Sequence, residues 1–151
     1  MQKLREKLPD HIIVHTTDNS HFKAESFSNG GYMTVHNQVG DLIDFYNIQY
    51  FKTAKTYSDL FTASNSVSVQ ALIDKGIPSN KIIIGKTVIS VYSDGYVDST
   101  TLGSWTSQAY DEMSWYGGVS LYHYFYDQDG THIAAATNEF KSKCESNGVC
   151  V

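Results

Sequence analysis

The chain has 151 residues, two of them cysteines, and carries a formal net charge of -5. This length suits one domain but falls well short of the roughly 250 residues of a complete eight-stranded barrel. An acidic chain without a basic cluster argues against nucleic acid and against an anionic membrane as partners. No apolar run approaches the ~20 residues that a membrane span needs.

The opening segment, MQKLREKLP, mixes basic and acidic side chains and lacks the apolar core of a signal peptide. We expect residues 1–8 to form the end of a helix, with Lys3, Arg5 and Lys7 on its solvated face. A chain that opens with the end of a helix, ahead of its first strand, is typical of a piece of a larger repeating fold.

Four apolar segments at near-regular intervals predict β-strands. They cover residues 11–15, 42–51, 81–88 and 119–124. The first and third contain the uninterrupted β-branched runs IIV and III, whereas half-buried strands alternate apolar and polar residues. Such runs are typical of strands covered on both faces, as in a parallel sheet.

Helical patterns fill the intervals between these strands. The first interval holds a loop at NGG, residues 29–31, and at most a short helix over residues 36–41. The next helix is capped by Ser66 or Ser68 and ends before Gly76. Two more helices are expected, one from about Thr100 to the GG pair at 117–118 and one from the DGT turn at 129–131. The alternation indicates βαβ crossovers, so the predicted fold class is α/β with four parallel βα units.

The most distinctive motif lies in the second predicted strand, which contains DFYNIQYFK at residues 44–52. It resembles the sixth barrel strand of the family 18 glycoside hydrolases, the chitinases, which reads Asp-Phe-aromatic-Asn-Val-Gln-aromatic-Tyr-Asn. Three further segments resemble that family in the right order. They are IIVHTTDNSHF (12–22) for its fifth strand, KGIPSNKIIIGK (75–86) for the approach to its seventh, and GGVSLY (117–122) for its eighth.

The resemblance implies half of a (β/α)8 TIM barrel, made of the fifth to eighth barrel units, over residues 1–141. Residues 142–151 are predicted to form a flexible C-terminal tail. Its cysteines, Cys144 and Cys150, flank an Asn147-Gly148 turn, and the spacing suits either a small disulfide loop or two free thiols. The six histidines are scattered without metal-ligand spacing, so no metal site or cofactor is expected.

Barrel chemistry takes place at the C-terminal ends of the strands. The exposed candidates there are Thr16, Thr17, Asp18, Gln49, Phe51, Lys86, Tyr122 and His123. Four of them are predicted to bind substrate: Gln49, Phe51, Tyr122 and Thr17. The alternative is plain core packing for the two aromatic residues and a buried amide satisfied by the backbone for Gln49. Asp44 is expected to tether a loop or cap a helix.

The family's acidic signature, Asp-x-x-Asp-x-Asp-x-Glu, occurs nowhere in the chain. In that family its last residue is the general acid, and the substrate's own N-acetyl oxygen is the nucleophile. A Tyr of the family donates its hydroxyl to the acetamide where this chain has Phe51, and a Trp lies under the sugar where this chain has Tyr122. We therefore expect no catalytic residue here and no hydrolysis by this chain.

The resemblance implies chitin or N-acetylglucosamine oligosaccharides as partners. Three functions stay open: half of a chitinase barrel that needs its other half, a lectin-like carbohydrate-binding protein, or a structural remnant. The family is commonly secreted, which implies an extracellular location. A half-barrel would expose two strand edges and one face of its sheet, so we also predict a homodimer or an aggregation-prone monomer.

Overall fold

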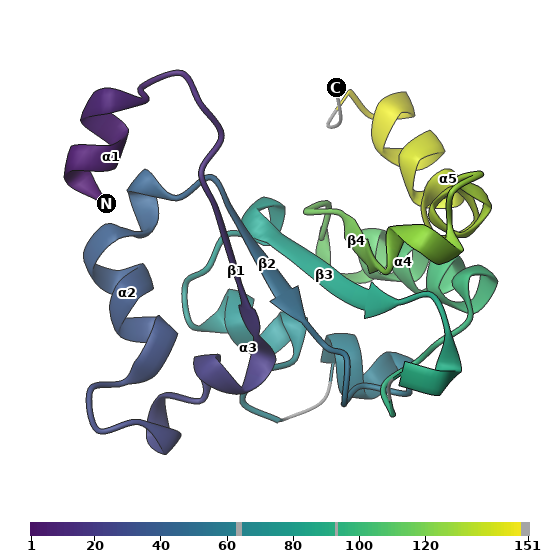
Figure 1. Cartoon of the computed structure of the whole chain (residues 1–151), viewed down its shortest axis with the longest axis horizontal. Helices are drawn as coiled ribbons and strands as arrows, with labels where there is room; N and C mark the ends of the chain where they lie inside the picture. Colours follow the sequence, from purple (N-terminus) through teal and green to yellow (C-terminus); the bar gives the residue numbers. More distant parts are fainter. Residues whose placement is uncertain (63–64, 93, 149–151) are drawn as a thin grey trace.

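A four-stranded parallel sheet forms the centre of the computed structural model, which describes residues 1–62, 65–92 and 94–148. The strands follow one another in chain order: β1 (Val14–Asp18), β2 (Phe45–Gln49), β3 (Ile82–Thr87) and β4 (Val119–Tyr122). Figure 1 shows α1 and α2 at the β1 end of the sheet and α4 and α5 at the β4 end. The order of strands and the parallel pairing confirm the predicted fold class.

A helix follows each strand, as four βα units require. After α1 (Gln2–Lys7), the described helices are α2 (Gly31–Val39), α3 (Val69–Asp74), α4 (Ser99–Met113) and α5 (Thr131–Ser146). Short turns complete the connections, notably η1 (Asn19–Phe22) after β1, the π-turn η4 (Ser58–Thr62) after β2, η6 (Ser90–Tyr92) after β3 and η7 (Tyr124–Tyr126) after β4. The right-handed twist of parallel strands favours this regular alternation.

Local capping explains where the helices start. Of the two candidate serines, Ser68 caps α3, and its Oγ accepts a hydrogen bond from the Ala71 amide at 3.2 Å. The carboxylate of Asp98 caps α4 in the same way. Gly30 and Gly130 precede α2 and α5 with φ of 77° and 72°, a left-handed conformation that glycine adopts without steric cost.

The core lies between the sheet and the helices. Tyr46 and Ile48 of β2 and Ile82 and Ile84 of β3 point into it and are fully buried. Trp115, just after α4, is also fully buried, and its Nε1 donates a hydrogen bond to the carbonyl oxygen of Ile82 at 2.9 Å. The opposite face of the sheet, the inner face of a barrel, carries only half-buried and exposed side chains on β1, β2 and β4.

Three sequence predictions need correction. The first strand begins at Val14 and not at residue 11, and Ile12 and Val14 are exposed, because none of the described elements covers them. The helix before β2 is longer and earlier than expected, since Gly30 starts it. α5 reaches Ser146 and so includes residues 142–146, which were assigned to the C-terminal tail. The choice between a Cys144–Cys150 disulfide loop and two free thiols involves Cys150, which lies outside the described residues.

The expected tether at Asp44 is confirmed. Its carboxylate accepts hydrogen bonds from the Ile13 amide at 2.7 Å and from Arg5 at 2.6 Å, which joins α1 to the start of β1 and β2. These two bonds, the Ile13 amide first, lower the pKa of Asp44. In the described part of the chain no helix is both long and apolar enough to cross a membrane.

Candidate binding surface

The inner face of the sheet is built by the period of two along each strand. On β2, Asn47 and Gln49 are half-buried on this face, while Tyr46 and Ile48 are buried under the helices. Strand register extends the row across the sheet through side chains level with these two. They are Thr16 and Asp18 on β1, Ile83 on β3 and Ser120 on β4, and the residue of β3 level with Gln49 is Gly85, which has no side chain.

A polar cross-link spans the middle of this face. The amide nitrogen of Asn47 donates to the Ser120 hydroxyl at 3.2 Å, so β2 and β4 are joined over β3. Gly85 leaves room for this bond, because a Cβ there would lie 3.2 Å from Asn47 Oδ1. Asn47 Oδ1 itself is buried and has no hydrogen-bond partner among the described residues.

Two of the predicted site residues meet at the C-terminal edge of the sheet. The rings of Phe51 and Tyr122 are stacked, with centroids 5.3 Å apart and an interplanar angle of 23°. Tyr122 keeps 51% of its surface exposed, and Phe51 is half-buried. The ring of His123 lies against the ring of Tyr122, and the centroids of these two rings are 3.6 Å apart. Gln49 lies on the same face of β2, two residues before Phe51.

Thr17, the fourth predicted residue, does not join this group. Its register partner is Ile48, so its side chain lies on the helix-covered face, where it is only 7% exposed. Its hydroxyl makes a 2.5 Å hydrogen bond with Nδ1 of His21. The residues of β1 on either side of Thr17, Thr16 and Asp18, lie on the inner face.

Asp18 places a carboxylate at the C-terminal end of the inner face, level with Gln49. Its Oδ1 accepts hydrogen bonds from the amide and the hydroxyl of Ser20, at 2.9 Å and 2.6 Å. One carboxylate oxygen is therefore engaged in capping η1, and the other is available to a ligand.

Lys86 was predicted to be exposed at the end of β3, and that prediction is wrong. The side chain is fully buried, and its ammonium group contacts backbone carbonyl oxygens of the loop that follows β2. Burial lowers the pKa of Lys86 to about 7, against the opposing influence of the Asp59 carboxylate. A lysine enclosed in this way cannot touch a bound molecule.

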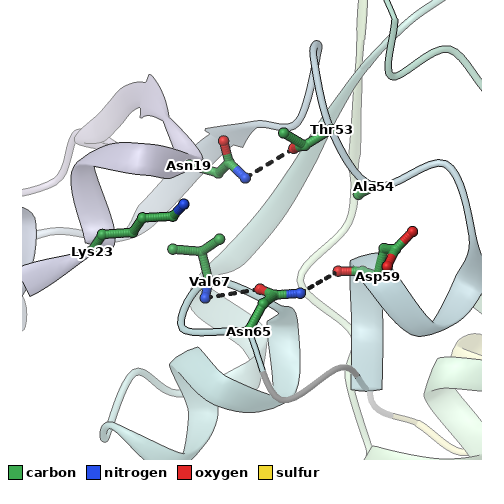
Figure 2. A pocket seen from close by; sticks show the side chains of 7 residues that line it. All are labelled: Asn19, Lys23, Thr53, Ala54, Asp59, Asn65 and Val67. Carbon is green, nitrogen blue, oxygen red and sulfur yellow. Dashed lines mark hydrogen bonds between the residues drawn. The ribbon is translucent and has the colours of Figure 1, made fainter. Parts of the chain in front are cut away.

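A polar cavity of about 210 Å³ lies beside the sheet edge, between the loops after β1 and β2 (Figure 2). Its lining consists of Asn19, Lys23, Thr53, Ala54, Asp59, Asn65 and Val67. Asn19 donates to the Thr53 hydroxyl at 3.0 Å, which holds the two loops together. An ammonium, a carboxylate and two amides around one cavity can hydrogen-bond the hydroxyl and amide groups of a ligand.

A second cavity of about 390 Å³ adjoins the first and shares three of its residues, Asn19, Lys23 and Thr53. The second cavity is also lined by Asp18, on the inner face of the sheet, and by Lys52, which follows Phe51 in the chain. It therefore extends from the inner face to the loop after β2. Apart from Asp18, which was among the exposed candidates, these residues were missed by the sequence reasoning. The only available signal was their position directly after two predicted strands. Among the described residues, no group of three His, Cys, Asp or Glu side chains is placed to hold a metal ion.

Four consecutive parallel βα units, with polar and aromatic side chains gathered at the C-terminal strand ends, define part of a TIM barrel. No family model and no curated protein sequence matches the chain. Several solved structures are similar to the chain. Some 91% of the chain is similar to 51% of a family 18 chitinase from Pseudoalteromonas aurantia, with a TM-score of 0.71 and 23% identity.

A fungal endo-β-N-acetylglucosaminidase of glycosyl hydrolase family 18 is similar over 91% of this chain and 47% of its own, with a TM-score of 0.66 and 20% identity. The chain thus spans about half the length of both enzymes. At these identities the likeness establishes the fold. The chain is a half barrel of four parallel βα units with the fold of these enzymes, as the sequence motifs predicted.

Proposed function

We propose that this chain binds oligosaccharides of N-acetylglucosamine, as found in chitin, at the C-terminal ends of β2 and β4 and does not hydrolyse them. The stacked pair of Phe51 and Tyr122 carries the proposal. Sugar rings present flat C–H faces that pack against aromatic rings, and binding sites combine such apolar surfaces with a few well-placed polar groups. The two similar structures are named a chitinase and an endo-β-N-acetylglucosaminidase, which supports this class of ligand.

Polar groups of the right kind lie beside the aromatic pair. The Gln49 amide is half-buried on the same face and can both donate to and accept from a sugar hydroxyl or acetamide. On the next strand, Asp18 offers its second carboxylate oxygen at the same level. A saccharide stacked on Tyr122 would therefore find hydrogen-bond partners toward β1.

Binding without hydrolysis follows from the side chains available. Substrate-assisted glycoside hydrolysis needs a protonated carboxylic acid at the leaving oxygen and a group that holds the acetamide. Phe51 has no hydroxyl with which to hold the acetamide. Among the described side chains of β1 to β4, the carboxylate on the inner face is that of Asp18, which accepts two hydrogen bonds from Ser20. Only its Oδ1 is engaged in this way, and in our proposal the second oxygen accepts a hydrogen bond from the sugar.

Calorimetric titration with chitotetraose tests the proposal. Tyr122→Ala and Gln49→Ala should each weaken binding, the first by about fivefold because stacking on an aromatic ring contributes on the order of 1 kcal/mol. Tyr124→Ala is the matched control, since Tyr124 is a more exposed tyrosine (78%) two residues further on that is not stacked on Phe51. Equal affinity of wild type and Tyr122→Ala would instead favour a structural role without a sugar ligand.

The half-length match favours a second proposal, that the edges of this sheet associate with a further set of strands. β1 and β4 are the edge strands of the described sheet, and an unpaired edge is a template for another strand. We propose a second copy of this chain as the partner, because two sets of four parallel strands supply the eight of a closed barrel.

A further inference from the structure

The buried ammonium group of Lys86 is enclosed by four backbone carbonyl oxygens. Its Nζ lies 2.7 Å from the oxygen of Ala54, 2.8 Å from that of Gly95, 3.0 Å from that of Thr53 and 3.2 Å from that of Tyr50. A lysine ammonium has three N–H donors, so every one of them finds an acceptor and one is shared. Carbonyl dipoles pointing inward from several sides form a site for a small cation.

The four carbonyls come from two loops that are distant in the chain. Tyr50, Thr53 and Ala54 belong to the loop after β2, which also carries Phe51, and Gly95 belongs to the segment between η6 and α4. The side chain of Lys86, from the strand β3 between them, therefore binds both loops at a single point. Thr53 and Ala54 also line the cavity in Figure 2.

The two loops are in direct backbone contact at this point. The Gly95 amide donates to the Phe51 carbonyl at 2.8 Å. A Cβ on Gly95 would lie only 2.4 Å from the Thr53 carbonyl oxygen and 2.6 Å from that of Phe51, so only glycine permits the approach. The loop after β2 is thus closely held against the loop after β3.

Ala54 has the left-handed φ of 62°, which a non-glycine residue adopts at a steric cost. Such a conformation persists where the surroundings hold it in place. Here the Ala54 carbonyl makes the shortest of the four contacts with Lys86. The lysine therefore opposes relaxation of this turn to an ordinary conformation.

We propose that Lys86 is a positioning residue that binds the loop after β2 to the loop after β3 and so places Phe51 against Tyr122 and shapes the adjoining polar cavity. The inference rests on the proposed sugar binding for its functional consequence. The ammonium acts through the loop and not on a ligand, because the carbonyl oxygens surround it and the side chain has no exposed surface.

The test uses Lys86→Ala, which removes the atoms of n-propylammonium from the side chain and leaves the carbonyl site empty. Two quantities are measured on the whole chain: amide hydrogen exchange and chitotetraose affinity. We expect exchange at the Gly95 amide to accelerate at least tenfold and sugar affinity to fall at least tenfold. Amides in the centre of α5, on another part of the sheet, should exchange as in the wild type.

Added n-propylammonium should restore both quantities in Lys86→Ala, whereas 1-propanol, of similar size but neutral, should not. If the variant does not fold alone, recovery of folding by the amine and not by the alcohol serves the same purpose. An unchanged Gly95 exchange rate would overturn the proposal. So would a faster exchange with wild-type sugar affinity, since the loops would then loosen without consequence for the site.

Failure of the proposed function gives a different result. A wild-type chain that binds no chitotetraose refutes sugar binding, while hydrogen exchange at Gly95 with and without the amine still decides whether Lys86 binds the two loops together.

Discussion

The rings of Phe51 and Tyr122 stack with their centroids 5.3 Å apart. Phe51 lies two residues after the end of β2 and Tyr122 is the last residue of β4, and these two strands are not neighbours in the sheet. β3 lies between β2 and β4, and the residue it places level with Gln49 and Ser120 on the inner face is Gly85. With no side chain at that position, nearby side chains of β2 and β4 can meet across it, as Asn47 and Ser120 do. The aromatic pair meets one step closer to the C-terminal edge, where the residue of β3 level with Tyr122 is Thr87.

Restoring a hydroxyl at position 51 should strengthen sugar binding. Phe51→Tyr keeps the ring that stacks on Tyr122 and adds a donor where the family resemblance places one for the acetamide. A net hydrogen bond contributes roughly 0.5–1.5 kcal/mol, so affinity for chitotetraose should rise about two- to tenfold. Titration calorimetry measures the change.

The deacetylated tetrasaccharide is the control for this substitution. It lacks the acetamide, and its affinity should not improve in Phe51→Tyr. An equal gain for both sugars would mean that the new hydroxyl contacts some other group, and the inferred orientation of the saccharide would be wrong.

The sequence predicted the parallel sheet from uninterrupted β-branched runs and the alternation of strands and helices, and it placed Gln49 and Phe51 together at the end of one strand. Tyr122 could be added because a family motif fixed its strand. Thr17 was misplaced by a single residue of register, since adjacent residues of a strand lie on opposite faces. The run TTD at residues 16–18 contains no signal for which of its residues points inward.

Lys86 and the cavity in Figure 2 depend on information that no local pattern holds. A lysine at a strand end is ordinarily exposed, and only the folded loops supply the carbonyl oxygens that allow its burial. The cavity brings together Asn19, Lys23 and Asp59 from separate loops. Their distances follow from the packing of η1 and η4 and not from any spacing in the sequence.

A methyl group on Gly95 should displace the loop that carries Phe51. Gly95→Ala places a Cβ within 2.4 Å of the Thr53 carbonyl oxygen, so one of the two backbones must move. Overpacking of this kind costs roughly 1–3 kcal/mol, which thermal or urea unfolding will detect. We also expect weaker chitotetraose binding.

Another glycine-to-alanine substitution is not a good control for Gly95→Ala, because Gly76 and Gly148 both have positive φ, which alanine adopts only with strain. Ser107→Ala, a small buried change on α4, is a better one. Ser107→Ala should bind chitotetraose as tightly as the wild type does. If Gly95→Ala also binds it as tightly as the wild type, the position of Phe51 does not matter for binding.

Stability should depend on pH through Lys86. Burial lowers the pKa of this lysine from 10.5 to about 7 in the folded chain. Between these two values the unfolded chain holds a proton that the folded chain has released, so the free energy of unfolding rises with pH across this window. The contribution of this one group has a slope of up to about 1.4 kcal/mol per pH unit.

Lys86→Met isolates this effect, because its other titrating groups are those of the wild type. Urea unfolding of both proteins at about pH 6, pH 7.5 and pH 9 gives the difference in unfolding free energy. That difference should be flat below pH 7 and should shift in favour of the wild type above it. A difference constant up to pH 9 would show that the carbonyl oxygens keep Lys86 protonated throughout.

The edge strands should make the chain associate. β1 and β4 form opposite edges of the described sheet (Figure 1), and apolar side chains near the first of them, Ile12 and Val14, are 71% and 43% exposed. All four strands run in one direction, so β1 of one copy can pair in parallel with β4 of another and close an eight-stranded ring. Light scattering should therefore show a mass that rises from monomer to dimer with concentration.

Val14→Lys should weaken this association by about tenfold or more, because edge charges oppose strand pairing. Val91→Lys, at an exposed position in η6 and away from both edges, should associate like the wild type. If the chain stays a monodisperse monomer at high concentration, the proposal that two copies associate through their edge strands is wrong.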